Sequence, residues 1–140
     1  MGRGDGAMDR RANGKARVVG IGRQPATGPS RGDVLLADLP DVGGHVLRGP
    51  HPVVLVQGDR MALSSTVIVV PLTSAAKAAE FRPPFLVEVR ARDSGLDRDG
   101  WAKCDQPTTV GSSRLGARVG RLNSETMEAV DSALRFVLAL

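Results

Sequence analysis

The chain has 140 residues, of which 41% are hydrophobic and 24% are charged, so it fits one modest globular domain and excludes a large multidomain enzyme. Its formal net charge of +4 comes from residues 1–30, where six basic residues face two acidic ones. Residues 31–140 hold thirteen basic and thirteen acidic residues, so their bulk charge does not indicate a nucleic-acid-binding protein.

The sequence predicts no membrane segment, secretion signal, disulfide or metal site. The longest apolar stretch, residues 67–72, is far shorter than the roughly 20 residues that cross a bilayer, and the N-terminus does not resemble a secretory leader. We therefore expect a cytoplasmic protein that does not contact membranes. Cys104 is the single cysteine, so no intramolecular disulfide is expected, and with two histidines it does not predict a zinc site. No cofactor is expected.

Residues 1–30 have a composition typical of a disordered segment. They are rich in Gly, Arg, Ala, Pro and Ser and contain only one short apolar pair, Val18 and Val19. So little apolar surface does not offset the entropy lost on ordering. We expect a disordered basic extension over residues 1–30, which either attracts RNA weakly or has no function, and one domain over residues 31–140.

From residue 33 onwards, short runs of β-branched and aliphatic residues alternate with Gly, Pro and Asp, a pattern typical of strands and turns. The predicted strands are residues 34–39, 53–57, 66–73 and 85–89, a less apolar fifth over 101–110, and a short one over 119–122. This spacing indicates a small barrel. Pro71 and Pro107 lie inside predicted strands, where they indicate bulges or edges. Residues 74–80 predict a short helical turn, and the Asp-Arg-Asp-Gly run at 97–100 predicts a solvated turn.

The C-terminal segment predicts a helix. Asn123 and Ser124 are typical N-cap residues, and two glutamates follow in the first turns. The apolar residues of the helix form a single stripe, composed of Met127, Val130, Leu134, Val137 and Leu138. The chain ends in an apolar cluster that also contains Phe136 and Leu140, which must pack against the sheet or against a second copy. A homodimer is one of the two ways to cover this cluster.

Reactive polar side chains are concentrated in three stretches, residues 44–52, 71–74 and 103–107. The first contains both histidines, His45 and His51. In the third, strand alternation places Lys103 and Asp105 on one face and Cys104 on the other. A cation beside a carboxylate is either a catalytic pair or an exposed salt bridge that contributes little to stability.

The order and spacing of several segments resemble the MazF/PemK (Kid) family of toxins. These segments are Arg-Gly-Asp-Val at 31–34, Pro-Val-Val-Leu-Val at 52–56, Ile-Val-Val-Pro-Leu-Thr-Ser at 68–74, Cys-Asp-Gln-Pro at 104–107, Arg-Leu-Gly at 114–116 and the closing helix. The resemblance covers residues 31–140. It implies a mainly β, SH3-like small barrel of the CcdB/PemK type with a C-terminal helix, and a homodimer. It also implies a type II toxin that cuts single-stranded RNA without a metal and is neutralised by a cognate antitoxin, with DNA contacted only through that antitoxin.

The resemblance also assigns roles to residues. Asp105 matches the general base, Lys103 a catalytic arginine, His45 a loop histidine and Thr73 a threonine near the scissile phosphate. The expected RNA contacts are Arg48, His51, Ser74 and Gln106. Many family members carry an arginine where this chain has His51, so three outcomes are open: Arg48 supplies the missing cation, His51 transfers protons, or cleavage is weak.

These roles define a metal-free transesterification. The 2′-hydroxyl of the RNA would be the nucleophile, Asp105 would remove its proton, and Lys103 would stabilise the phosphorane and protonate the leaving 5′ oxygen. The products would be a 2′,3′-cyclic phosphate and a 5′-hydroxyl. Histidine titrates near neutral pH, so His45 or His51 would suit proton transfer better than a carboxylate. Lysine holds phosphate as a point charge, whereas arginine offers two donors, so we expect lowered activity.

Two other functions remain open for the same fold. An inactive member would only bind antitoxin, and the departure at His51 favours this. A CcdB-like protein would poison DNA gyrase without chemistry, whereas the polar groups gathered on one face favour the ribonuclease. The resemblance places base specificity in loops such as residues 57–64.

Overall fold

The computed structural model describes residues 28–74, 80 and 82–140. Its strands are β1 (Asp33–Leu39), β2 (Gly49–Leu55), β3 (Thr66–Thr73), β4 (Leu86–Val89), β5 (Gly100–Lys103), β6 (Thr108–Gly111) and β7 (Leu115–Arg121), and helix α2 (Ser124–Leu138) closes the chain. Three 3-10 turns connect strands: η1 (Asp59–Met61), η2 (Ala91–Asp93) and η3 (Ser112–Arg114). Most of the expected extension over 1–30 and of the expected helical turn over 74–80 lies outside the described residues. No helix in the described part is long and apolar enough to span a bilayer.

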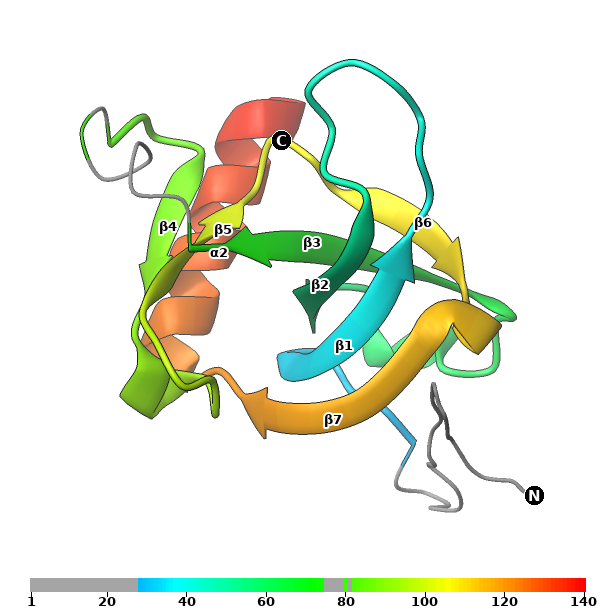
Figure 1. The fold of residues 1–140 in the computed structure, drawn as a ribbon. Helices are drawn as coiled ribbons and strands as arrows, with labels where there is room; N and C mark the ends of the chain where they lie inside the picture. Colours follow the sequence, from blue (N-terminus) through cyan, green and yellow to red (C-terminus); the bar gives the residue numbers. More distant parts are fainter. Residues whose placement is uncertain (1–27, 75–79, 81) are drawn as a thin grey trace.

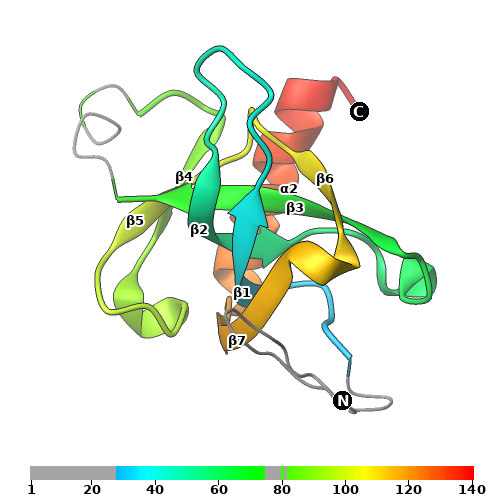
Figure 2. The ribbon, with the colours of Figure 1, turned by 45° about the vertical axis from the view of Figure 1, so that its right-hand side comes forward.

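The strands form one antiparallel sheet that bends around itself. Its order is β4-β5-β3-β2-β1-β7, and β6 pairs with β3 as well. Strand β3 is central because its first half pairs with β6 and its last two residues pair with β5. Figures 1 and 2 show β7 curving past β1 while β3 crosses the molecule. The mainly β fold with a C-terminal helix is confirmed. The barrel is open, because the hydrogen-bonded order of the described strands ends at β4 and β7.

The structure explains how β3 accommodates Pro71 in its interior. Pro71 is buried and pairs with Val53 of β2, so it lies neither at the sheet edge nor in a register shift of that pair. The carbonyl of Ile68 accepts a hydrogen bond from Val56 on the β2 side. The backbone N–H and C=O groups of successive residues in a strand point to opposite edges, so the nitrogen of Pro71, three residues after Ile68, points away from β2. On that edge of β3, residues 66–69 pair with β6 and residues 72–73 pair with β5, and Pro71 lies between these two segments. The missing N–H therefore removes no hydrogen bond at this junction.

The prediction of one strand over residues 101–110 is wrong. The segment forms β5 and β6, separated by a tight turn in which the nitrogen of Gln106 donates to the carbonyl of Lys103 (2.9 Å). Pro107 lies in the connection after this turn and not inside a strand. Before the turn, β5 pairs with β4 and with the end of β3. After it, β6 pairs with the first half of β3.

Two apolar clusters lie on the two sides of the sheet. One joins strands β1 to β5 to helix α2 through Val130 and Ala133, and the other lies between β1, β2, β3 and β6. Helix α2 packs beside β4, as Figure 1 shows. The predicted cap is confirmed, because Oδ1 of Asn123 accepts from the nitrogen of Thr126 (2.8 Å).

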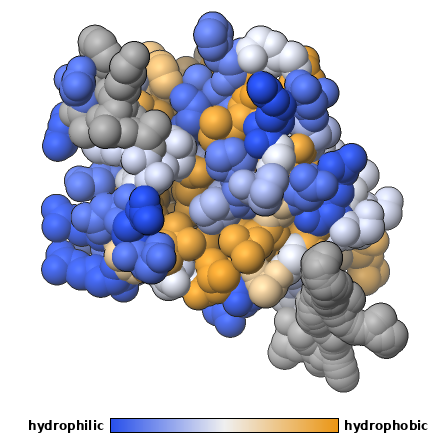
Figure 3. Space-filling model, viewed as in Figure 1, coloured by the Kyte–Doolittle hydropathy of each residue, from blue (hydrophilic) through white to orange (hydrophobic). Residues whose placement is uncertain are grey.

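The apolar stripe of α2 is only partly covered. Met127, Val130 and Leu134 pack against the first cluster as expected. In contrast, Phe136 is 62% exposed, Leu138 53% and Leu140 86%. Figure 3 shows further apolar surface in the middle of the face that it presents. The described chain therefore does not bury its own C-terminal cluster.

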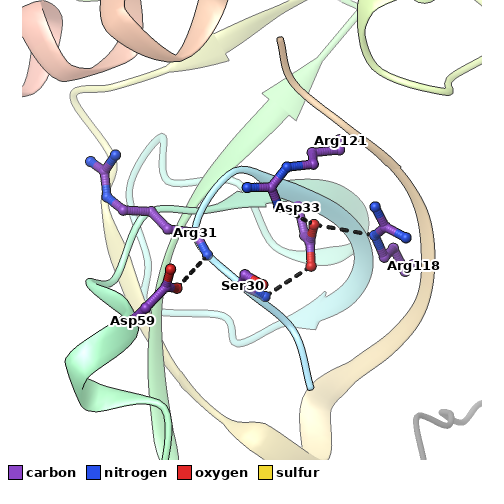
Figure 4. A network of polar contacts seen from close by, with 6 residues as sticks. All are labelled: Ser30, Arg31, Asp33, Asp59, Arg118 and Arg121. Carbon is purple, nitrogen blue, oxygen red and sulfur yellow. Dashed lines mark hydrogen bonds and ion pairs between the residues drawn. The ribbon is translucent and has the colours of Figure 1, made fainter. Parts of the chain in front are cut away.

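A buried carboxylate joins the start of β1 to β7. The Asp33 side chain, only 5% exposed, lies 2.7 Å from Arg121 and 3.2 Å from Arg118, and it accepts a hydrogen bond from the nitrogen of Ser30 (2.8 Å; Figure 4). The neighbouring Arg31 forms an ion pair with Asp131 of α2. These contacts fix β1 relative to β7 and α2, and sequence reasoning missed them.

Candidate active site

The register of the sheet places His51, Thr73 and Trp101 in one row across β2, β3 and β5. Thr73 pairs directly with Trp101, and Val53 pairs with Pro71. His51 and Thr73 each lie two residues from that second pair, so they share its face of the sheet, and both line one cleft. Directly opposed residues on neighbouring strands share one face of the sheet. Lys103 lies two residues beyond Trp101 and therefore on that same face. The fold thus brings three predicted site residues from separate strands to one face.

Asp105 follows this row in the turn after β5. The alternation expected here holds for Cys104, which is buried in the core and donates from its nitrogen to the carbonyl of Phe85 (3.0 Å). Asp105 itself is exposed. Within the part of the chain that the structure describes, no ion pair joins Lys103 to Asp105, so the carboxylate is open to solvent and to a ligand.

The thiol of Cys104 is expected to be unreactive. Burial raises its pKa to about 12, and the negative charges of Asp105 and Asp131 contribute in the same direction. A thiol that stays protonated near neutral pH is a poor nucleophile. Cys104 is therefore a core residue, although it lies between two candidate catalytic residues.

Gln106 connects the turn to the loop between β1 and β2. Its Oε1 accepts from the nitrogen of Leu47 (3.0 Å), and its Nε2 donates to the carbonyl of His45 (3.3 Å). Gln106 was expected to contact RNA, but in this structure its side-chain amide binds protein backbone. It thereby holds the His45 loop beside the turn that carries Lys103 and Asp105, while the His45 side chain is exposed.

Arg48 lies in the same loop and faces Asp41. Its Nε is 3.8 Å from Oδ2 of Asp41, and both side chains are largely exposed. The structure therefore shows Arg48 paired within its own loop. An exposed pair of this kind is weak, so RNA phosphate would compete for the guanidinium.

A cleft of about 250 Å³ opens at the end of this face. His51, Thr73 and Ser74 line it together with the loop over residues 96–100. Gly100 permits the close approach of that loop, because a Cβ at this position would lie 2.7 Å from the carbonyl oxygen of Thr73. Residues 97–99 are exposed as the predicted turn requires, but sequence reasoning missed that they form a wall of this cleft.

The loop over residues 57–64 lines a different cavity, of about 190 Å³. The side chain of Gln57 organises this loop, since its Nε2 donates to the carbonyls of Met61 (3.2 Å) and Thr66 (3.3 Å). None of the eight predicted site residues lines this cavity. Across the described residues, no group of three or more His, Cys, Asp or Glu side chains is arranged to hold a metal ion.

Comparisons with known proteins agree on one family. Residues 30–138 match the family model described as "PemK-like, MazF-like toxin of type II toxin-antitoxin system". The chain is 37% identical over 111 residues to endoribonuclease EndoA of Bacillus subtilis, a match that covers 79% of this chain and 94% of that protein. Among solved structures, it resembles a mycobacterial endoribonuclease in complex with its cognate antitoxin, with a TM-score of 0.66 and 27% identity over 81% of this chain and 97% of that one. MazF of Deinococcus radiodurans has the same fold, with a TM-score of 0.68 and 19% identity over 80% of this chain and 97% of that one.

Proposed function

This chain belongs to the PemK-like, MazF-like toxins of type II toxin–antitoxin systems and is an endoribonuclease toxin of that family; we propose that it cleaves single-stranded RNA through the RNA's own 2′-hydroxyl, without a metal ion. The observation that carries this mechanism is the face shared by His51, Thr73 and Lys103, with Asp105 in the adjoining turn. Transesterification of RNA requires a base, a cation for the phosphorane and an acid for the leaving oxygen. The face and its adjoining turn supply all three types of group.

Each residue has a defined task in this proposal. Asp105, exposed and without an ion pair to Lys103, removes the proton of the 2′-hydroxyl. Lys103 stabilises the phosphorane and donates the proton to the 5′ oxygen, which leaves as a hydroxyl, while the other product carries a 2′,3′-cyclic phosphate. Thr73 contacts the phosphate from the end of β3. His45 orients the RNA or assists proton transfer from the loop that Gln106 holds.

Further RNA contacts are proposed at the edges of this face. His51 and Ser74 line the cleft beside Thr73, and Arg48 contributes a guanidinium from the loop between β1 and β2. Gln106 contributes indirectly, by placing that loop.

We further propose that a cognate antitoxin neutralises the toxin and that the chain acts as a cytoplasmic homodimer. Two similar solved structures are complexes: a mycobacterial endoribonuclease with its cognate antitoxin, and MazE–MazF of Deinococcus radiodurans. An acidic, partly disordered antitoxin segment would order along the basic side chains of the RNA face. The exposed Phe136, Leu138 and Leu140 favour a second copy, since this apolar cluster is left uncovered in the single chain.

The first experiment is incubation of the purified protein with a long single-stranded RNA in EDTA, followed by mapping of the new 5′ ends. We expect discrete cuts that carry 5′-hydroxyls. Lys103→Ala and Asp105→Asn should abolish most of this cleavage, whereas Glu128→Gln, on the exposed side of α2, should not change it. Cleavage that requires added Mg²⁺, or that persists near the wild-type rate in Asp105→Asn, would contradict the proposed mechanism.

One observation favours a second candidate, a member that binds antitoxin and cuts poorly. The row on the sheet carries His51 where the family resemblance implies arginine, and Arg48 faces Asp41 instead of this row. If the folded dimer makes no cuts, His51→Arg should restore them. A DNA-supercoiling assay with gyrase separates both candidates from a CcdB-like poison, which alone would inhibit gyrase.

A further inference from the structure

We propose that the cleft between the end of β3 and the loop over residues 96–100 is a nucleobase subsite that selects adenine, cytosine or guanine over uracil. The inference rests on the proposed ribonuclease function and adds to it the chemistry that chooses the cutting site. The cleft has about 250 Å³ and is lined by Thr73 and His51 of the candidate active face. A base seated there would therefore flank the phosphate that is cut.

The floor of the cleft suits a planar heterocycle. Leu72 and Val89 are buried at its base, and Pro52 and Leu96 complete an apolar lining. Ligand sites are usually apolar with a few placed polar groups, and sites for drug-sized molecules begin at roughly 300 Å³. A slightly smaller cleft fits one base, and proteins that read single-stranded RNA splay such bases out of the strand.

The rim of the cleft carries hydrogen-bond acceptors. The Asp97 side chain is exposed and makes no hydrogen bond or ion pair with the residues that the structure describes. Asp99 uses its Oδ1 to accept from the nitrogen of Ala91 (2.8 Å), which leaves Oδ2 available. Carboxylates accept from the amino groups of bases, as Glu and Asp do from cytosine N4. Uracil carries a carbonyl oxygen where cytosine carries its amino group, and its one ring donor on this edge, N3–H, lies between two carbonyl oxygens. A carboxylate that accepts from N3–H therefore also faces those oxygens, so uracil fits this rim less well than a base with an amino group.

The charges at the rim also argue for a base and against a phosphate inside the cleft. Asp97 and Asp99 would repel a phosphate that entered beside them. Arg98 and His51 line the same cleft and can hold the RNA backbone outside it. The base and its phosphate thus have separate partners.

The loop is anchored to β7 and by its own hydrogen bonds, which favours discrimination between bases. A Cβ on Gly95 would lie 2.1 Å from the carbonyl oxygen of Val119, and one on Gly120 would lie 2.1 Å from that of Ser94, so the loop backbone lies directly against β7. The Ser94 hydroxyl accepts from the nitrogen of Leu96 (3.2 Å) and donates to the carbonyl of Ala91 (3.3 Å). Because little reorganisation is needed on binding, mismatched hydrogen bonds are not relieved by movement of the loop.

The test maps cut sites on an RNA pool of random sequence for the wild type, Asp97→Asn, Asp97→Ala and the control Glu128→Gln. The wild type and the control should show uracil depleted about tenfold or more at one position beside the cut. Asp97→Asn should reduce this depletion, because its amide can donate to a uracil carbonyl, and Asp97→Ala should weaken the preference without favouring uracil. A wild type that tolerates uracil at every position, or an unchanged depletion in both Asp97 variants, would overturn the subsite.

A binding measurement separates this inference from the proposed catalysis. Trp101 is the only tryptophan, the chain has no tyrosine, and Trp101 adjoins Gly100 of the cleft, so its fluorescence reports occupancy. Oligonucleotides of 2′-deoxyadenosine, 2′-deoxycytidine or 2′-deoxyuridine lack the nucleophile and cannot be cut. We expect severalfold weaker binding of the uracil oligonucleotide, and loss of this difference in Asp97→Ala. Equal affinities, or no binding of any oligonucleotide, would refute the subsite even if RNA is cut. A base preference in a protein that never cuts would instead support the subsite and refute the catalytic proposal.

Discussion

The side-chain oxygen of Gln106 accepts a hydrogen bond from the backbone nitrogen of Leu47 at 3.0 Å, across 59 positions of sequence. With the second bond to the carbonyl of His45 (3.3 Å), this amide ties the loop between β1 and β2 to the turn that carries Asp105. One side chain therefore sets the distance between two parts of the proposed active site.

Gln106→Ala should lower kcat/KM for RNA cleavage about tenfold or more, because the His45 loop loses its attachment and small misplacements of catalytic groups are costly. Gln106→Glu keeps the acceptor for the nitrogen of Leu47 but loses the donor to the carbonyl of His45. Its kcat/KM should therefore fall less than that of Gln106→Ala. Asn123→Ala is the control for lost stability, since the Asn123 side chain also holds backbone, at the start of helix α2, and has no proposed contact with RNA. Equal losses of kcat/KM in Asn123→Ala and Gln106→Ala would show that stability, and not placement of the His45 loop, causes the effect.

Lys103→Arg should cut RNA a few times faster than the wild type. The guanidinium offers two parallel donors to a phosphate, whereas the ammonium is a point charge. Lys103 ends β5 on the face of Thr73, so a longer and planar group there still reaches the same space. Single-turnover rates with saturating protein measure this step directly, and a rate below that of the wild type would show that the ammonium is needed for proton donation.

Asp33→Asn should reduce the free energy of unfolding by about 2 kcal/mol, since hydrogen bonds to a charged, buried group are among the strong ones. The carboxylate lies beside Arg118 and Arg121 and is 5% exposed. Asp38→Asn is the control, because Asp38 forms only an exposed ion pair with Arg114 at 3.5 Å. This substitution should lower the free energy of unfolding by less than about 0.5 kcal/mol. Urea denaturation followed by circular dichroism measures both, and similar losses would refute a special role of Asp33.

Cys104 should react with a thiol reagent only after unfolding, because burial raises its pKa from 9.0 to about 12 in the folded chain. In the unfolded chain the thiol ionises at lower pH, so between pH 9 and 12 the folded state binds more protons. The stability that this group contributes is therefore complete below pH 9 and declines as the pH rises towards 12. Urea midpoints of the wild type should fall more steeply over this range than those of Cys104→Ala, and parallel pH profiles would contradict the assignment.

Local patterns in the sequence were sufficient for several elements. The prediction of β3 over residues 66–73 matches the structure at both ends, since this run of β-branched residues has breakers on both sides. The cap at Asn123 and the packing of Val130 were also predicted correctly, because capping and the helical period act within a few residues. The family resemblance, based on short segments in the right order, assigned catalytic roles to Thr73 and Lys103, and the register of the sheet places both on one face.

Other features depend on contacts between distant segments. Strand β2 begins at Gly49, four residues before its prediction, because residues 49–52 pair with β1 despite their glycine and prolines. The division of residues 101–110 into β5 and β6 follows from their pairing with opposite halves of β3.

The sequence by itself determined the class of fold, the helix and which residue types are available for RNA chemistry, because periodicity, capping and motif spacing are local. Only the tertiary structure decided that Gln106 holds the His45 loop, that Asp33 is buried between two arginines, and that residues 96–100 form a cleft beside Thr73. Each of these depends on backbone segments that approach within a few ångströms, such as Gly100 against Thr73, and such approaches are set by how the sheet bends and not by any single stretch of residues.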